Sequence, residues 1–212
     1  TPVANSQQST IPAIRAWRDH GLGPGVPDPS VVVSTVDVQR EGRYWYASKV
    51  RELGGGQWRY EYAVFNLNSD ASGASFTIPF PQGVVASNPG FNAPRYHSGE
   101  VYNNAPWVTT IASDHITWAS PDTYASNPNG AALRWGTMYN FWFDANAGPA
   151  AANASATMGL FKPFDPNSIA FDVQAPGEAQ CYANCDASTT SPALNALDFA
   201  CFINRFAGAE LW

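Results

Sequence analysis

Residues 43–66 read RYWYASKVRELGGGQWRYEYAVFN and contain the clearest hairpin pattern in the sequence. In residues 43–50 two sets of side chains alternate, which is typical of a β-strand that buries one face. In residues 57–66 one face collects the large apolar side chains Trp58, Tyr60, Tyr62 and Val64. Between the two runs, Gly54–Gly56 provides residues that tolerate the backbone angles of a tight turn. The stretch therefore predicts a β-hairpin.

Short runs of the same kind continue along the chain and predict about nine or ten strands. They cover residues 31–38, 74–79, 84–87, 107–111, 115–119, 131–135, 137–144 and 155–162. Turn sequences such as 88–90, 126–130 and 146–149 separate them. Repeated βα units are absent from the sequence, so we expect an all-β chain folded as an antiparallel β-sandwich of immunoglobulin-like or jelly-roll type. The prolines after residue 163 predict a linker, giving an arm (1–30), a sandwich (31–163), a linker (164–180) and a tail (181–212).

Composition and charge exclude several classes of partner. Charged residues make up only 13% of the chain, and 17 Asp and Glu outnumber 11 Lys and Arg. Without a basic run, a nucleic-acid partner is not expected. No apolar stretch approaches the roughly 20 residues of a membrane span. Residues 1–10 lack the cationic start and apolar core of a signal peptide, so we expect a mature product or a fragment.

The arm carries a short helical pattern. Ile11, Ile14 and Trp17 recur at near-helical spacing, and Gly21 is a plausible stop. Two interpretations follow: a strap folded back on its own domain, or an arm that docks on a neighbouring subunit. The strap is favoured because termini more often fold back or fray than exchange between chains.

The tail holds the one group of residues with specific metal chemistry. Oxygen-bearing side chains recur there, at Asn184, Asp186, Ser188, Asn195 and Asp198. Calcium prefers six to eight oxygen ligands, and a loop with ligands at alternate positions wraps one ion. Phe199, Phe202 and Phe206 then fall on one side of a predicted helix and form a candidate interaction surface. The loop carries few carboxylates and lacks the usual glycine, so the predicted affinity for calcium is weak.

Residues 181–206 resemble the cysteine-containing (GC-type) dockerin-like domain found at the C-termini of secreted planctomycete proteins. The resemblance rests on the Cys-Tyr-Ala-Asn-Cys-Asp start and on Asp-Phe-Ala-Cys-Phe at 198–202. Family members usually carry two such repeats, whereas this chain has one half. The resemblance implies an extracellular or cell-surface protein docked through its tail, with Asn184, Asp186, Ser188, Asn195 and Asp198 as calcium ligands. The β-rich region upstream also looks like the region that precedes this tail in similar proteins.

All three cysteines lie in this tail, which favours an extracytoplasmic location. Two cysteines in each repeat of the family imply a local disulfide between Cys185 and Cys201. Cys181 then stays unpaired within the chain or pairs outside it, and a Cys181–Cys201 disulfide is the alternative.

Two functions compete at this stage. The first is a secreted, non-enzymatic structural or interaction module that is anchored at the cell surface or assembles into an extracellular polymer through its arm and tail. It would self-associate or bind a protein partner. The alternative is a carbohydrate-binding module docked to an extracellular enzyme complex. It would stack a glycan on a platform of tryptophans from the set Trp45, Trp58, Trp107, Trp118, Trp135 and Trp142. We expect at least half of this set to be buried in the core. No catalytic residues are predicted, because neither a carboxylate pair nor a nucleophile motif stands out.

Overall fold

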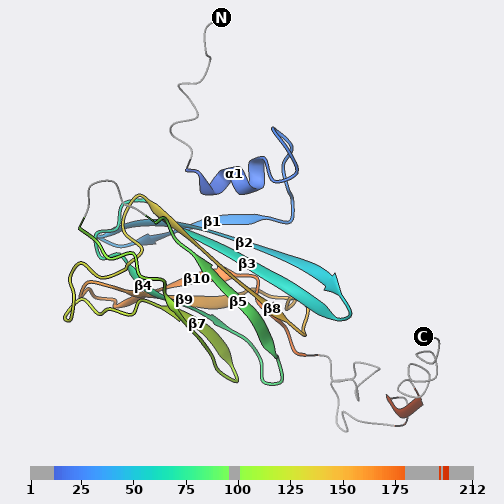
Figure 1. Ribbon diagram of the computed structural model, residues 1–212. Coiled ribbons are helices and arrows are strands. Elements are labelled where there is room, and N and C mark those ends of the chain that lie inside the picture. The colour runs from blue at the N-terminus through green and yellow to red at the C-terminus, as the bar shows by residue number, and fades with distance from the viewer. Residues whose placement is uncertain (1–11, 96–100, 180–195, 197, 201–212) are drawn as a thin grey trace, which may run out of the picture.

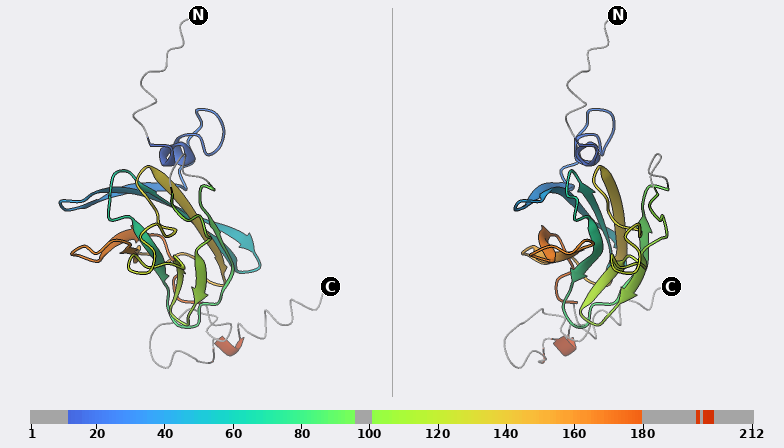
Figure 2. Two further views of the ribbon diagram at one scale, coloured as in Figure 1. Left: turned by 60° about the vertical axis from the view of Figure 1, so that its left-hand side comes forward. Right: turned by 90° about the vertical axis from the view of Figure 1, so that its left-hand side faces the viewer.

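The computed structural model describes residues 12–95, 101–179, 196 and 198–200. Two five-stranded sheets lie face to face, and every strand pair in them is antiparallel (Figures 1 and 2). The first sheet has the order β1-β2-β3-β8-β5, and the second has the order β10-β9-β4-β7-β6. The predicted antiparallel β-sandwich is confirmed.

The first sheet is built from β1 (Val32–Val38), β2 (Gly42–Gly54), β3 (Gln57–Asn66), β8 (Thr137–Ala145) and β5 (Ala86–Asn92). The second is built from β10 (Ser168–Val173), β9 (Ala154–Leu160), β4 (Gly73–Pro79), β7 (His115–Ala119) and β6 (Val108–Ile111). One short helix, α1 (Ile14–Asp19), lies on the side of the first sheet that faces away from the second sheet (Figure 1). Within the described ranges, no helix has the length and apolar composition needed to cross a bilayer.

The hairpin predicted from residues 43–66 forms as β2 and β3. The strands pair from Tyr44 opposite Asn66 to Gly54 opposite Gln57. Gly54, Gly55 and Gly56 all have positive φ angles, which residues with a Cβ rarely adopt. The glycine triplet therefore makes the reversal, while the alternating side chains on either side fix which face enters the core.

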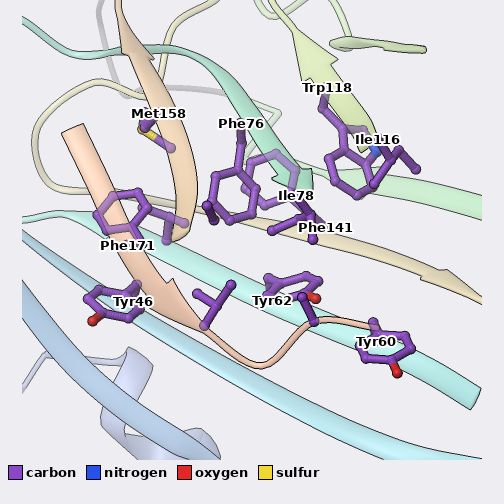
Figure 3. Packing of buried hydrophobic residues seen from close by; sticks show 14 of the residues in the cluster. Tyr46, Tyr60, Tyr62, Phe76, Ile78, Ile116, Trp118, Phe141, Met158 and Phe171 are labelled. Atoms are coloured by element: carbon purple, nitrogen blue, oxygen red, sulfur yellow. The ribbon is translucent and has the colours of Figure 1, made fainter. Parts of the chain in front are cut away.

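Aromatic side chains fill the space between the sheets (Figure 3). Phe76 of β4 lies 4.8 Å from Phe141 of β8, measured between ring centroids, and the Phe141 ring lies 5.4 Å from Trp118 of β7. Two of the buried tyrosine hydroxyls find partners at the core margin, since Tyr60 and Tyr62 donate to the carbonyl oxygens of Ala147 and Gln174, both at 2.8 Å. This satisfies polar groups that would otherwise be costly to bury.

The predicted linker, 164–180, is wrong in part. Residues 168–173 form β10, which pairs with β9 along its whole length and places Phe171 in the core. The sandwich thus extends past the predicted boundary at residue 163. The prolines at 163, 166 and 176 flank the strand without interrupting it, so the proline-rich composition hid the alternation inside.

Two local predictions are also corrected. Residues 88–90 were expected to be a turn, yet β5 passes through them with an irregular register between Ser87 and Gly90. Pro89 is tolerated because β5 is an edge strand. Residues 131–135 were expected to be a strand, but only Leu133 makes an isolated bridge, to Gly73.

Candidate functional site

The outer face of the first sheet, here called the helix-covered face, carries four rows of side chains that cross the strands. Inward residues such as Tyr60 and Phe141 alternate with outward ones, so each row contains one outward residue from each strand that it crosses. The rows run Trp45–Phe65–Met138, Ala47–Ala63–Asn140–Asn92, Lys49–Glu61–Trp142–Gly90 and Arg51–Arg59–Asp144–Ser87. The face therefore changes from apolar at one end to charged at the other.

Helix α1 covers the apolar end of this face. Ile14 is only 1% exposed and packs with Val31, Ala47 and Ala63 in a small cluster separate from the main core. The arm is therefore a strap folded back on its own domain. The prediction that Ile14 docks on a neighbouring subunit is wrong, because its side chain is already buried in its own domain. Ile11, from the same predicted set, lies outside the described residues.

A groove of about 430 Å³ remains between the helix and the edge strand β5. Trp17 of α1 lines it from the side of the helix, and Trp142 of β8 lines it on the side of β5. Glu61, Asn140 and Asn92 supply the polar side chains of its lining. We call this hollow the tryptophan groove.

Trp142 owes its position to a missing side chain on the neighbouring strand. Gly90 pairs with Trp142, and a Cβ on Gly90 would lie 1.9 Å from Cε2 and 2.0 Å from Cζ2 of the indole. The ring consequently lies across the glycine, in space that any other residue would occupy. A half-buried indole held in this way presents a fixed apolar surface to the groove.

Next to the indole, two side-chain amides lie directly opposite each other. Asn92 of β5 pairs with Asn140 of β8, and both side chains line the groove. Neither amide makes a hydrogen bond to another residue in the described part of the chain. Each offers two donor hydrogens and a carbonyl acceptor, so the pair can accept and donate to hydroxyl groups of a ligand.

Each basic side chain in the four rows has an acidic partner. Lys49 lies 2.7 Å from Asp28, and Arg51 lies 3.6 Å from Glu61. Arg59 donates two hydrogen bonds to Asp144, from Nε to Oδ1 and from Nη2 to Oδ2, the latter over 3.0 Å. These hydrogen bonds from Arg59 hold the pKa of the Asp144 carboxyl below its ordinary value. The face is rich in charges but close to neutral in sum.

A second hollow, of about 490 Å³, lies at the end of the sandwich beyond the β2–β3 turn. Within the described part of the chain, Trp58 is the one aromatic residue in its lining, and Gly148 packs close to that indole. Glu52 and Glu178 line it too, but both are exposed. It lacks the groove's pairing of two aromatic side chains with unbonded amides, so we regard the tryptophan groove as the better candidate site.

The predicted metal, disulfide and interaction residues of the tail fall mostly outside the described residues. This holds for Asn184, Asp186, Ser188, Asn195, Cys181, Cys185, Cys201, Phe202 and Phe206. Asp198 is buried and belongs to a helical stretch, whereas Phe199 beside it is 68% exposed. The calcium site and the disulfide pairing therefore stay predictions.

Of the six candidate platform tryptophans, Trp107 and Trp118 are buried in the core. The expectation that at least half would be buried is wrong, because Trp45, Trp58 and Trp142 are half-buried and Trp135 is exposed. Trp142 is among the residues that the sequence predicts for a platform, whereas Gly90, Asn92 and Asn140 are not. The alternation of Asn140 and Trp142 with inward Tyr139, Phe141 and Phe143 was a usable indication of the outward pair.

Comparisons of the chain with family models, with curated proteins and with solved structures give no match.

Proposed function

We propose that the chain is a non-catalytic carbohydrate-binding module and that the tryptophan groove holds a neutral glycan. The observation that carries the proposal is the Trp142 indole lying across Gly90 beside the unbonded amides of Asn92 and Asn140. A pyranose ring has an apolar face of C–H groups and a rim of hydroxyls. A fixed indole next to free amides complements both parts at once.

The charges support a neutral ligand. Lys49, Arg51 and Arg59 are each engaged by a carboxylate of the same face or of the strap. An acidic polysaccharide would have to displace those carboxylates, and it would also approach a chain with a net charge of −6. A neutral glycan requires neither.

The acids of the groove support binding over hydrolysis. Glycoside hydrolysis ordinarily uses two carboxylates that flank the bond to be broken. Among the residues that the structure describes, the lining of the groove includes one carboxylate, that of Glu61, which lies 3.6 Å from Arg51. This arrangement suits a residue that orients the ligand or keeps the sheet face in order.

The test is affinity gel electrophoresis in gels that contain xyloglucan, hydroxyethyl cellulose or galactomannan, with pull-down on insoluble cellulose and chitin. We expect at least one of these neutral polysaccharides to retain the protein. Trp142→Ala should weaken that binding by about 5- to 30-fold, since loss of a stacked indole costs about 1–2 kcal/mol. Trp135→Ala is the matched control, because Trp135 is 62% exposed and does not line the groove.

Two results would overturn the proposal. One is the absence of retention by every neutral polysaccharide while the protein is folded by circular dichroism. The other is an equal loss of affinity in the Trp142 and Trp135 variants, which would mean that exposed indoles adsorb glycans without a built site.

A second function, docking of a secreted chain through its tail, is supported by the exposed Phe199 in the helical stretch 198–200. A large apolar side chain in this position suits burial against a protein partner or a second copy. The predicted calcium ligands of this tail are Asn184, Asp186, Ser188, Asn195 and Asp198. Calorimetric titration with Ca²⁺ checks the ion, and mass photometry of wild type and Phe199→Asp checks self-association.

A further inference from the structure

We infer that the N-terminal strap, residues 12–30, is part of the glycan site: Trp17 is a second glycan-contacting residue, and Asp28 positions it. The inference rests on the proposed function and extends it, because it makes one side of the groove a separate segment of chain. The sandwich alone would then have an incomplete site.

Trp17 reaches the groove because Ile14 anchors the helix. The two residues are three positions apart in α1, so their side chains lie on neighbouring parts of one helix surface. Ile14 is buried among Val31, Ala47 and Ala63, while Trp17 is half-buried at the margin of this cluster and lines the groove. Trp142 lines the groove from the β5 side, so a glycan lying over Asn140 would meet an indole at either end.

Asp28 closes the strap against the sheet. Its backbone N–H donates to the carbonyl oxygen of Arg18, at the end of α1, over 2.7 Å. Its carboxylate accepts hydrogen bonds from Lys49 Nζ at 2.7 Å and from Ser30 Oγ at 2.6 Å. Only 3% of Asp28 is exposed. One aspartate thus ties the return limb of the strap both to the helix that carries Trp17 and to strand β2.

The two limbs of the strap approach closely at Gly21. A Cβ there would lie 2.3 Å from the carbonyl oxygen of Trp17 and 2.6 Å from Cβ of Asp28. Glycine is therefore required where the limb that carries Trp17 meets the limb that carries Asp28. Through this contact, the position of Asp28 helps to fix the position of the Trp17 indole.

Asp28 is also connected to the groove through the first sheet. Lys49, the partner of Asp28, belongs to the same cross-strand row as Glu61 and Trp142. The Ile14 cluster is separate from the main core, so release of the strap leaves the packing between the two sheets in place. Affinity for a glycan can therefore fall without loss of the fold.

The experiment measures affinity for the polysaccharide that retains the wild-type protein, together with thermal unfolding, for Trp17→Ala, Asp28→Asn and the double variant. We expect each single variant to bind about 3- to 10-fold more weakly. If Asp28 acts only by positioning Trp17, Asp28→Asn adds no further loss in the Trp17→Ala background, as a double-mutant cycle shows. Leu22→Ala is the control on the strap, since Leu22 is exposed and does not line the groove.

Hydrogen exchange of residues 12–30 supplies a second readout, because Asp28→Asn should raise exchange there and leave β3 and β8 protected. Wild-type affinity in Trp17→Ala, with affinity lost in Trp142→Ala, overturns this inference and leaves the proposed function standing. Wild-type affinity in both tryptophan variants overturns both. Equal losses from Asp28→Asn in the wild-type and Trp17→Ala backgrounds overturn the positioning role of Asp28.

Discussion

The two outer faces of the sandwich follow the same alternation of residues but carry different side chains. The helix-covered face combines indoles, amides and ion pairs with a glycine under one indole. The outer face of the second sheet, here called the threonine face, instead carries one row of short hydroxyl side chains. That row crosses four strands as Thr157–Thr77–Thr117–Thr110.

The outward residues of the two sheets differ because the fold and a binding site place different requirements on them. Both sheets bury the same kind of aromatic interior, so the core does not dictate what the outward residues are. Side chains of equal, short length give an even surface, and Thr77 and Thr117 satisfy each other across 2.7 Å. Large side chains next to Gly90 and Asn92 leave a concave surface, which a ligand can occupy.

The largest effect should come from replacing the Gly90 hydrogen beneath the Trp142 indole by a methyl group. Gly90→Ala forces the Trp142 indole off the sheet, because the new Cβ would lie 1.9 Å from Cε2. We expect a loss of about 1–2 kcal/mol in the free energy of unfolding, as for other overpacked sites, and a fall in glycan affinity of about tenfold. Urea unfolding and affinity electrophoresis measure the two quantities.

Gly159→Ala is the matched variant on the threonine face. Its Cβ would lie 2.6 Å from Ser75 Oγ, the end of a short side chain that can rotate away. We expect less than about 1 kcal/mol of destabilisation and unchanged glycan binding. If the two variants behave alike, the glycine beneath Trp142 has no special role and the comparison of the faces fails.

The next difference between the two faces should appear in the free energy of unfolding at acidic pH. Hydrogen bonds from Lys49 and Ser30 lower the pKa of Asp28 to about 2, and hydrogen bonds from Arg43 and Arg59 lower the pKa values of Asp37 and Asp144. All three carboxyls belong to the side of the first sheet that carries the helix-covered face. An unfolded aspartate has a pKa of about 3.9, so below that pH the unfolded chain binds more protons than the folded one.

Stability from these groups is therefore complete above about pH 5 and is lost as the pH falls through about 4 towards 2. Urea midpoints measured from pH 6 to pH 2.5 should show the decline, and Asp28→Asn should make it shallower. A decline that Asp28→Asn does not alter would contradict the role given to the Lys49 contact.

Much of the fold follows from the sequence because alternation and turn chemistry are local. Residues 43–66 contain both, and the β2–β3 register agrees with them. β10 was missed although Ile169, Phe171 and Val173 alternate with outward residues, because the flanking prolines outweighed a six-residue pattern. The strand predicted at residues 131–135 does not form, although an apolar run suggested it. Arg134 donates to the carbonyl oxygens of Pro128 and Gly130, and these hydrogen bonds hold a compact loop there.

The site was harder to predict because it depends on contacts between distant segments. Trp142 was included among possible platform residues, but nothing local shows that it lies over Gly90, more than fifty positions earlier in the chain. The Asn88-Pro-Gly sequence favoured a turn, so Gly90 was not considered as a strand residue beneath a ring. Trp17 was predicted as an interaction residue, but its place beside the groove depends on the Asp28–Lys49 contact, which only the folded chain creates.

The smallest effect should come from the threonine row itself. Thr77→Val keeps the β-branched shape that suits a strand and removes one hydroxyl of the pair. Thr117 is half-buried, so its hydroxyl can turn to water, and we expect a loss of only about 0.5–1 kcal/mol in the free energy of unfolding. The double variant Thr77→Val/Thr117→Val should recover part of it, because neither hydroxyl is then left without its partner. Urea unfolding of the four proteins measures this cycle, and glycan affinity should be the same in all of them. A fall in affinity would mean that the threonine face also contacts the polysaccharide, so that the two faces differ in chemistry but share one function.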